Sequence, residues 1–165
     1  MKIIQGKVFV LGKNIDTDQI YPGRFLELVD PKEIAGHCLE GVDPRLTQCI
    51  NPGDIIVAGT NFGCGSSREH AAITLLHAQI GAVVAESFAR IFYRNAINLG
   101  LNVLVCPKIT EKVKEGHIVE VDLMRGLVTN TTTGEVIQGE KLSDYALEIL
   151  ASGGIKPLFK KKYSS

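Results

Sequence analysis

The sequence predicts an α/β fold with a parallel sheet at its centre and a small antiparallel β-meander after it. Between residues 54 and 105, short segments of β-branched and small apolar residues alternate with longer segments of helical periodicity. Strands and helices that alternate in this way form a parallel sheet with right-handed crossovers. After residue 117 the pattern changes to short strand-like segments separated by turns at Arg125-Gly126 and Gly134, which is typical of hairpins. The 165 residues suit one core, so we expect a single domain over 1–165.

The elements before the α/β core are one strand, one helix and two loops. Residues 3–10 are rich in Ile and Val and predict a strand. Asp30 followed by Pro31 is typical of a helix N-cap and a first helical residue. We therefore expect a helix over 31–40 that stops at Gly41, and a polar loop after it.

The remaining elements follow from periodicity and from the positions of glycine and proline. Because Ser66 and Glu69 have the spacing of a capping box, we expect the first core helix to begin at Ser66. The tail over 160–165 is expected to be a solvated end. The predicted strands are 54–59, 82–85, 101–105, 118–122, 127–130 and 136–137, and the predicted helices are 66–79, 88–98 and 142–151.

Composition and charge exclude several classes of protein. The 18 basic residues balance the 18 acidic ones, which argues against a nucleic-acid binder, because such domains are usually basic. No apolar segment approaches the length of a membrane helix, and the first residues lack the apolar core of a signal peptide. We therefore expect a cytoplasmic protein that contacts no membrane. The cysteines form no C-x-x-C pair, so we expect no metal site or iron–sulfur cluster held by this chain alone and free thiols instead; they are Cys38, Cys49, Cys64 and Cys106.

The strongest local signal is a glycine-rich loop over 63–70 that follows a buried strand and precedes a helix. A capping box explains Ser66 and Glu69 without any function, but it leaves the glycines, Ser67 and Arg68 unexplained. Backbone N–H groups at a helix start and an adjacent guanidinium favour an anion, and glycines allow it to approach the backbone. We interpret this loop as a binding site for a carboxylate or phosphate.

Known loop templates fit this segment only in part. It lacks the Gly-Lys-Ser/Thr of a P-loop and the flanking glycines of a nucleophile elbow. The dinucleotide fingerprint matches at Gly63 and Gly65, and Glu86 stands near where a ribose-binding acid would lie. Arg68, however, occupies the position of the third glycine. A nucleotide-binding module and a pure interaction protein therefore remain as competing hypotheses.

Four segments resemble the aconitase superfamily, and above all the small subunits of 3-isopropylmalate dehydratases and of related homoaconitases. These segments are 61–70, 86–98, the Asp-Thr-Asp segment over 16–20, and the loop over 21–26. The resemblance implies a swivelling β/β/α domain. It also implies a large-subunit partner that holds a [4Fe-4S] cluster on three cysteines, with no cofactor in this chain.

The resemblance further implies a hydro-lyase that moves a hydroxyl between adjacent carbons of a malate-type di- or tricarboxylate. The iron would act as a Lewis acid on the departing hydroxyl, and Ser66, as an alkoxide, would be the catalytic base. Because a serine hydroxyl is a weak base near neutral pH, its anion needs N–H groups and cations nearby. Ser67 and Arg68 would bind a carboxylate, Arg24 would bind a second one, and Asp18 would belong to the same substrate-binding group.

The stretch Phe25, Leu26, Glu27 and Leu28 is where the family distinguishes the side chains of its substrates. Its apolar residues favour a branched alkyl group, and Glu27 would repel the extra carboxylate of a homoaconitase substrate. We therefore expect interconversion of 2- and 3-isopropylmalate in leucine biosynthesis. Because Glu27 also departs from the usual isopropylmalate pattern, 2,3-dimethylmalate, citramalate and homoaconitate remain as alternatives.

Overall fold

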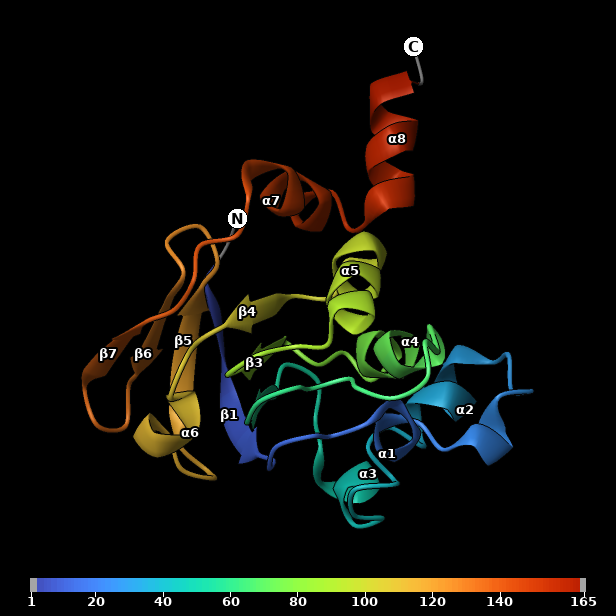
Figure 1. Cartoon of the computed structure of the whole chain (residues 1–165), viewed down its shortest axis with the longest axis horizontal. Helices are drawn as coiled ribbons and strands as arrows, with labels where there is room; N and C mark the ends of the chain where they lie inside the picture. The colour runs from blue at the N-terminus through green and yellow to red at the C-terminus, as the bar shows by residue number, and fades with distance from the viewer. Residues whose placement is uncertain (1–2, 164–165) are drawn as a thin grey trace.

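The computed structural model describes residues 3–163 and contains a seven-stranded sheet with helices packed against its parallel part (Figure 1). The strand order is β4-β3-β2-β1-β5-β6-β7. The strands are β1 (Ile4–Val10), β2 (Ile55–Ala58), β3 (Ala82–Ala85), β4 (Val103–Val105), β5 (Ile118–Asp122), β6 (Leu127–Asn130) and β7 (Glu135–Gln138).

Strand β1 joins a parallel half of the sheet to an antiparallel half. Its residues 4–7 pair antiparallel with β5, and its residues 8–10 pair parallel with β2. Strands β2, β3 and β4 continue in parallel, whereas β5, β6 and β7 form an antiparallel meander. The predicted fold class, a parallel α/β core with a small meander, is confirmed.

The longer helices form the crossovers and the C-terminal end. Helix α4 connects β2 to β3, and α5 connects β3 to β4. Gly100 has a φ of 88°, a left-handed conformation that glycine adopts readily, and it ends α5 as predicted. The helices are α1 (Thr17–Ile20), α2 (Pro31–Ala35), α3 (Leu46–Cys49), α4 (His70–His77), α5 (Arg90–Leu99), α6 (Ile109–Lys112), α7 (Asp144–Ala151) and α8 (Ile155–Tyr163), with a 3₁₀-helix, η1, over Gly23–Phe25.

Several predicted boundaries are wrong. Helix α2 ends at Ala35 instead of residue 40, because the following turns bond to the third residue back and Leu39 has a φ of 60°. The short helices α1, α3 and α6 were not predicted. The tail, expected as a solvated end over 160–165, belongs to α8 as far as Tyr163, and its last two residues lie outside the described ones. Leu158, which is buried, anchors α8 to the rest of the chain.

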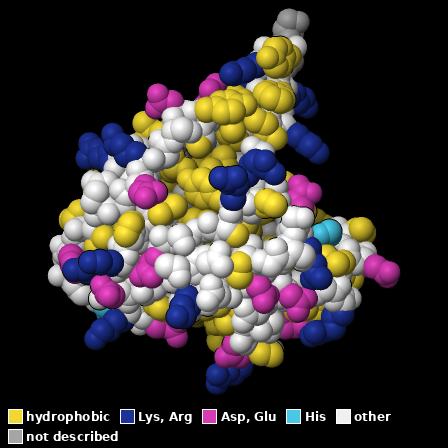
Figure 2. All heavy atoms as spheres, viewed as in Figure 1, with side chains coloured by type: hydrophobic (Ala, Val, Ile, Leu, Met, Phe, Trp, Pro, Cys, Tyr) yellow, Lys and Arg dark blue, Asp and Glu magenta, His cyan; other side chains and the backbone are white. Residues whose placement is uncertain are grey.

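The core lies on both sides of the parallel strands. Every residue of β2 and β3 is buried, as expected where helices cover both faces of a parallel sheet. Apolar side chains also gather on the surface around α7 and α8 (Figure 2), where Tyr145, Phe159 and Tyr163 are exposed. Between residues 3 and 163, no helix is long and apolar enough to cross a membrane.

Candidate functional site

The glycine-rich loop between β2 and α4 lies against the start of α5. Gly63 has a φ of 85°, and a Cβ atom placed there would overlap the ring of Phe92. Gly65 has a φ of 96° and faces Asp16 and Thr17. The loop therefore needs glycine at Gly63 for two separate reasons, the backbone conformation and the close approach to α5.

Helix α1 holds the other side of the same loop. The backbone N–H of Thr17 donates to the carbonyl of Cys64 at 2.8 Å, and the N–H of Gly63 donates to the carbonyl of Ile15 at 2.7 Å. The Thr17 hydroxyl donates to the carbonyl of Ser66 at 3.0 Å and lies 3.2 Å from Ser66 Oγ. These bonds fix the position of Ser66 relative to α1.

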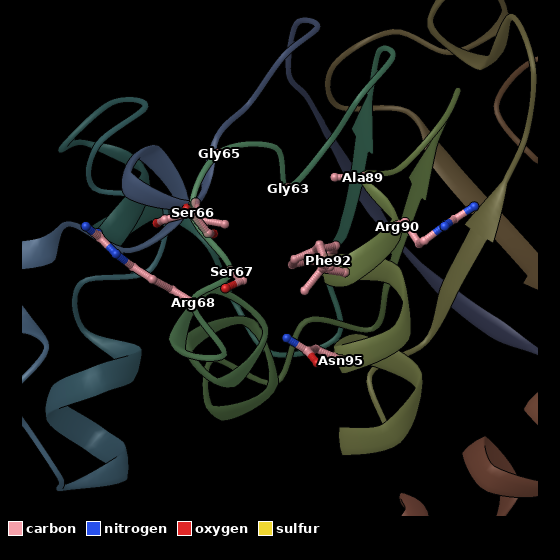
Figure 3. Close-up of a pocket in the computed structure, with 11 residues that line it drawn as sticks. Gly63, Gly65, Ser66, Ser67, Arg68, Ala89, Arg90, Phe92 and Asn95 are labelled. Atoms are coloured by element: carbon pink, nitrogen blue, oxygen red, sulfur yellow. Dashed lines mark hydrogen bonds between the residues drawn. The ribbon is translucent and has the colours of Figure 1, made fainter.

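A cavity of about 360 Å³ opens between this loop and α5. Ser66 and Ser67 lie on one side of it, and Phe92 and Asn95 lie on the other (Figure 3). The residues that line it are Thr17, Gly63, Gly65, Ser66, Ser67, Arg68, Ala89, Arg90, Ile91, Phe92 and Asn95.

The predicted capping box of Ser66 and Glu69 is wrong. Helix α4 begins at His70, its N-cap is Glu69, and no side chain caps it. The carbonyl of Ser66 accepts from the N–H of Arg68 at 2.8 Å in a tight turn before the helix. The Ser66 hydroxyl lies beside Thr17 instead, which leaves the two serines and Arg68 in a loop rather than in the first turn of a helix.

The helix start that borders the cavity belongs to α5. Its N-cap is Ala89, which has no side chain to accept a hydrogen bond, and the next residues, Arg90 and Ile91, line the cavity. The first N–H groups of a helix have no partner within the helix, and its dipole places positive charge there. This end of the cavity therefore suits an anion, although the sequence had suggested the start of the preceding helix.

The guanidinium of Arg68 is directed toward α1 rather than across the cavity (Figure 3). Its Nη1 donates to Asp18 Oδ1 at 3.0 Å, and the same oxygen accepts from the N–H of Gly23 at 2.8 Å. The hydrogen bond from the Gly23 N–H has the largest effect and the one from Arg68 the next largest; together they hold the pKa of Asp18 below its ordinary value. The structure thus brings Asp18 and Arg68 together as an ion pair at the edge of the site.

Arg24 and the predicted specificity stretch lie in and just after η1. Arg24 pairs with Glu40 at 2.8 Å and does not line the cavity. Tyr21 is buried, and its hydroxyl donates to the carbonyl of Phe25 at 2.7 Å; the ring of Phe25 stacks on His37, with centroids 3.6 Å apart. The segment is therefore held by contacts within this chain. Within it, Glu27 is exposed, whereas Phe25, Leu26 and Leu28 are partly buried.

The sequence did not single out six of the cavity residues as site residues: Thr17, Ala89, Arg90, Ile91, Phe92 and Asn95. Thr17 is the middle residue of the Asp-Thr-Asp segment, and Asn95 lies in the segment over 86–98. Both segments carry the resemblance to a known family, and that resemblance is the signal in the sequence that points to these residues. Glu86, by contrast, accepts from the N–H and the hydroxyl of Thr110 at 3.2 and 2.7 Å, and it does not line the cavity.

The cysteines do not form a cluster in the described residues. Within residues 3–163 there is no group of three or more His, Cys, Asp or Glu side chains that could hold a metal ion. Burial raises the pKa of Cys38 to about 12, and burial together with the nearby Glu86 raises that of Cys106 to about 11. All four thiols are free.

Comparisons with known proteins agree on one family. Residues 47–108 match the model of the aconitase C-terminal domain. The chain is 54% identical over 160 residues to an isopropylmalate/citramalate isomerase small subunit of Methanocaldococcus jannaschii, covering 97% of this chain and 95% of that protein. It is 48% identical to a 2,3-dimethylmalate dehydratase small subunit of Eubacterium barkeri, covering 92% of this chain and 93% of that protein. A crystal structure of a 3-isopropylmalate dehydratase from Methanocaldococcus jannaschii is similar to this chain, with a TM-score of 0.93 and 45% identity, covering 98% of this chain and 95% of that one.

Proposed function

Because this chain belongs to the aconitase superfamily, among the small subunits of 3-isopropylmalate-type dehydratases, we propose that it helps to interconvert 2- and 3-isopropylmalate in leucine biosynthesis. It is a subunit of a hydro-lyase. In the proposed reaction, a C–H and a C–O bond on adjacent carbons break and water leaves. Water then adds back with the two positions exchanged.

The observation that carries this proposal is the placement of two serine hydroxyls opposite a helix start in one cavity. Ser66 and Ser67 face Asn95 and the first turn of α5. A malate-type acid has carboxylates on both sides of the carbons that react. In this cavity a carboxylate bound at the α5 N-terminus would leave the neighbouring C–H near the serines.

We assign the role of base to Ser66 and the role of carboxylate ligand to Ser67. As an alkoxide, Ser66 would take the proton from the carbon next to the carboxylate and return it in the hydration step. Arg68 would supply counter-charge to the dianion that forms, with Asp18 orienting its guanidinium through the 3.0 Å contact. Arg24 would bind the far carboxylate after it leaves Glu40, its partner in this structure.

The small-subunit family implies a large-subunit partner. We propose that this partner holds a [4Fe-4S] cluster, which supplies Lewis-acid assistance to the departing hydroxyl when it is bound. Ile91, at the rim of the cavity, has 43% of its surface exposed, so a partner that covers the cavity would also bury this side chain. The free cysteines support a reducing compartment, and we place the assembly in the cytoplasm.

Specificity among substituted malates would come from the stretch Phe25, Leu26, Glu27 and Leu28. Its partly buried apolar side chains favour an alkyl substituent. The exposed Glu27 disfavours a third carboxylate, as in homoaconitate, by charge repulsion. Dimethylmalate and citramalate are the alternatives, because the names of two relatives include them.

The experiment is anaerobic co-expression with a candidate large subunit, followed by hydration assays with isopropylmaleate, dimethylmaleate, citraconate and homoaconitate. We expect the assembled enzyme to hydrate isopropylmaleate with the highest kcat/KM. The variant Ser66→Ala should assemble but lose at least about 1,000-fold in kcat, because the base is gone. Ser152→Ala, at the C-terminal end of α7, is the matched control and should retain full activity. No hydration of any of these acids by the assembled wild type, or saturable binding of NAD at the 63–68 loop, would contradict the proposal.

A further inference from the structure

We propose that Thr17 is a positioning residue that stabilises the anionic form of Ser66 by redirecting one hydroxyl proton. The inference rests on the proposed function of Ser66 as a base. It deepens that function by naming the group that makes the serine oxygen a better base than a free hydroxyl.

The contacts of Thr17 support this role directly. Its Oγ1 lies 3.0 Å from the carbonyl oxygen of Ser66 and 3.2 Å from Ser66 Oγ. Within residues 3–163, Thr17 is the one residue that makes a hydrogen bond to Ser66 Oγ. The guanidinium of Arg68 is committed to Asp18 instead.

The Thr17 hydroxyl can form a hydrogen bond with Ser66 Oγ both when Ser66 is neutral and when it is deprotonated. While Ser66 is neutral, Thr17 donates to the Ser66 carbonyl and accepts from the Ser66 hydroxyl. When Ser66, which is exposed, loses its proton to solvent water, Thr17 can rotate its own proton from the carbonyl to the charged Oγ, because a hydroxyl is both donor and acceptor. The carbonyl is not orphaned by this rotation, since it also accepts from the N–H of Arg68 at 2.8 Å.

The position of Thr17 is fixed by the start of α1. Asp16 Oδ1 accepts from the N–H of Gln19 at 2.8 Å, and Gln19 Oε1 accepts from the N–H of Asp16 at 3.0 Å, which forms a complete capping box. The N–H of Thr17 donates to Cys64, and only 3% of the residue is exposed. A Cβ atom on Gly65 would lie 3.5 Å from Thr17 Oγ1. The hydroxyl is thus held in place before any substrate arrives, as electrostatic stabilisation of an anion requires.

The test uses the assembled enzyme with Thr17→Val, which keeps the shape of the side chain and removes the hydroxyl, and with Thr17→Ser, which restores it. For Thr17→Val we expect kcat to fall by about 100-fold, the scale found when one anion-stabilising donor is removed. The acidic limb of the pH profile of kcat/KM should move to higher pH, because the anion loses a donor. KM should stay within about twofold, and Thr17→Ser should recover most of kcat and the original profile.

Thr74→Val is the matched control, because Thr74 is also buried and its hydroxyl donates to the carbonyl of Ile34 at 2.7 Å, away from the cavity. An unmoved acidic limb in Thr17→Val, a Thr17→Ser enzyme as impaired as Thr17→Val, or the same moved limb in Thr74→Val would each overturn the inference. If Thr17→Val does not assemble, Thr17→Ala decides by the same pH profile, and an unmoved limb overturns the inference. A wild type that hydrates none of the acids contradicts the proposed function itself, whereas an active wild type with an unmoved variant profile contradicts only the role of Thr17.

Discussion

The ion pair of Asp18 and Arg68 places an exposed carboxylate against a residue that we propose to bind substrate. Asp18 has 67% of its side chain exposed, so the pair itself adds at most about 1 kcal/mol to stability. Its larger effect is on orientation, because Asp18 is held by the N–H of Gly23 and in turn holds Arg68. The role of Asp18 in this proposal is therefore to fix the guanidinium rather than to touch the substrate.

Asp18→Asn should raise KM for the malate-type substrate by about fivefold, the equivalent of about 1 kcal/mol, because Arg68 loses its charged partner. Asp43→Asn is the matched control, since Asp43 pairs with Arg45 at 2.9 Å on the surface and its pKa is lowered by the same kind of contact. It should leave KM unchanged. Equal KM values for the wild type and Asp18→Asn would contradict the assigned orientation.

The same carboxylate predicts a pH dependence of stability. The pKa of folded Asp18 is lowered, so its contribution is fully present above the ordinary carboxyl pKa of about 3.9 and is lost as pH falls through the lower folded value. The difference in free energy of unfolding between the wild type and Asp18→Asn should therefore be present near neutral pH and vanish in strong acid. Urea unfolding of both proteins near neutral pH and in strong acid measures this difference in free energy.

At the residue scale, the sequence predicted the residues that lie next to one another but not the contacts between distant segments. Ser66, Ser67 and Arg68 are consecutive, so their proximity needed no structure. The contact between Thr17 and Ser66 joins residues 49 positions apart and depends on how α1 packs against the loop. Arg24 lies near Asp18 in the sequence, but this proximity did not predict that its side chain pairs with Glu40.

At the scale of elements, the glycine-rich loop forms one side of the cavity because it can approach α5 closely. Gly63 and Gly134 have nearly the same φ, 85° and 84°, but only Gly63 is packed against a side chain. Gly134→Ala should cost about 1 kcal/mol of stability for the backbone conformation alone. Gly63→Ala should cost roughly 2 kcal/mol more, because its Cβ would overlap Phe92, and the hydration activity should fall with it.

Urea unfolding of the two glycine variants separates these costs. Equal losses of stability in Gly63→Ala and Gly134→Ala would show that the contact with Phe92 carries no cost.

The sequence predicted the loop but placed the start of the following helix four residues too early. Capping-box spacing describes only local bonds, and here Thr17 engages the hydroxyl that the pattern assigned to the cap.

At the scale of the whole molecule, β1 decides whether the chain unfolds as one unit. Its two ends pair with different halves of the sheet, and Val8, at the junction, is fully buried. We expect amides of β3 and of β6 to exchange with the same free energy of opening. Val8→Ala should lower both by roughly 2 kcal/mol, whereas Val136→Ala, at a position 59% exposed in β7, should change them little.

Earlier exchange of the β6 amides than of the β3 amides would show that the meander opens independently, and would contradict the expectation of a single domain over 1–165. Alternating strands and helices predicted the parallel half of the sheet, and short strands separated by turns predicted the meander, because each half is built from segments close in sequence. The way in which β1 divides its pairing between them leaves no such periodic trace, and so it was visible only in the structure.

Phe92 lines one side of the cavity and also belongs to the hydrophobic core. Its ring packs edge-on against Phe62, with centroids 5.2 Å apart. If an acid binds there as we propose, it would contact a side chain that belongs to the hydrophobic core. Occupancy and folding become thermodynamically linked, so saturation with substrate should raise the melting temperature of the chain as well as fill its site.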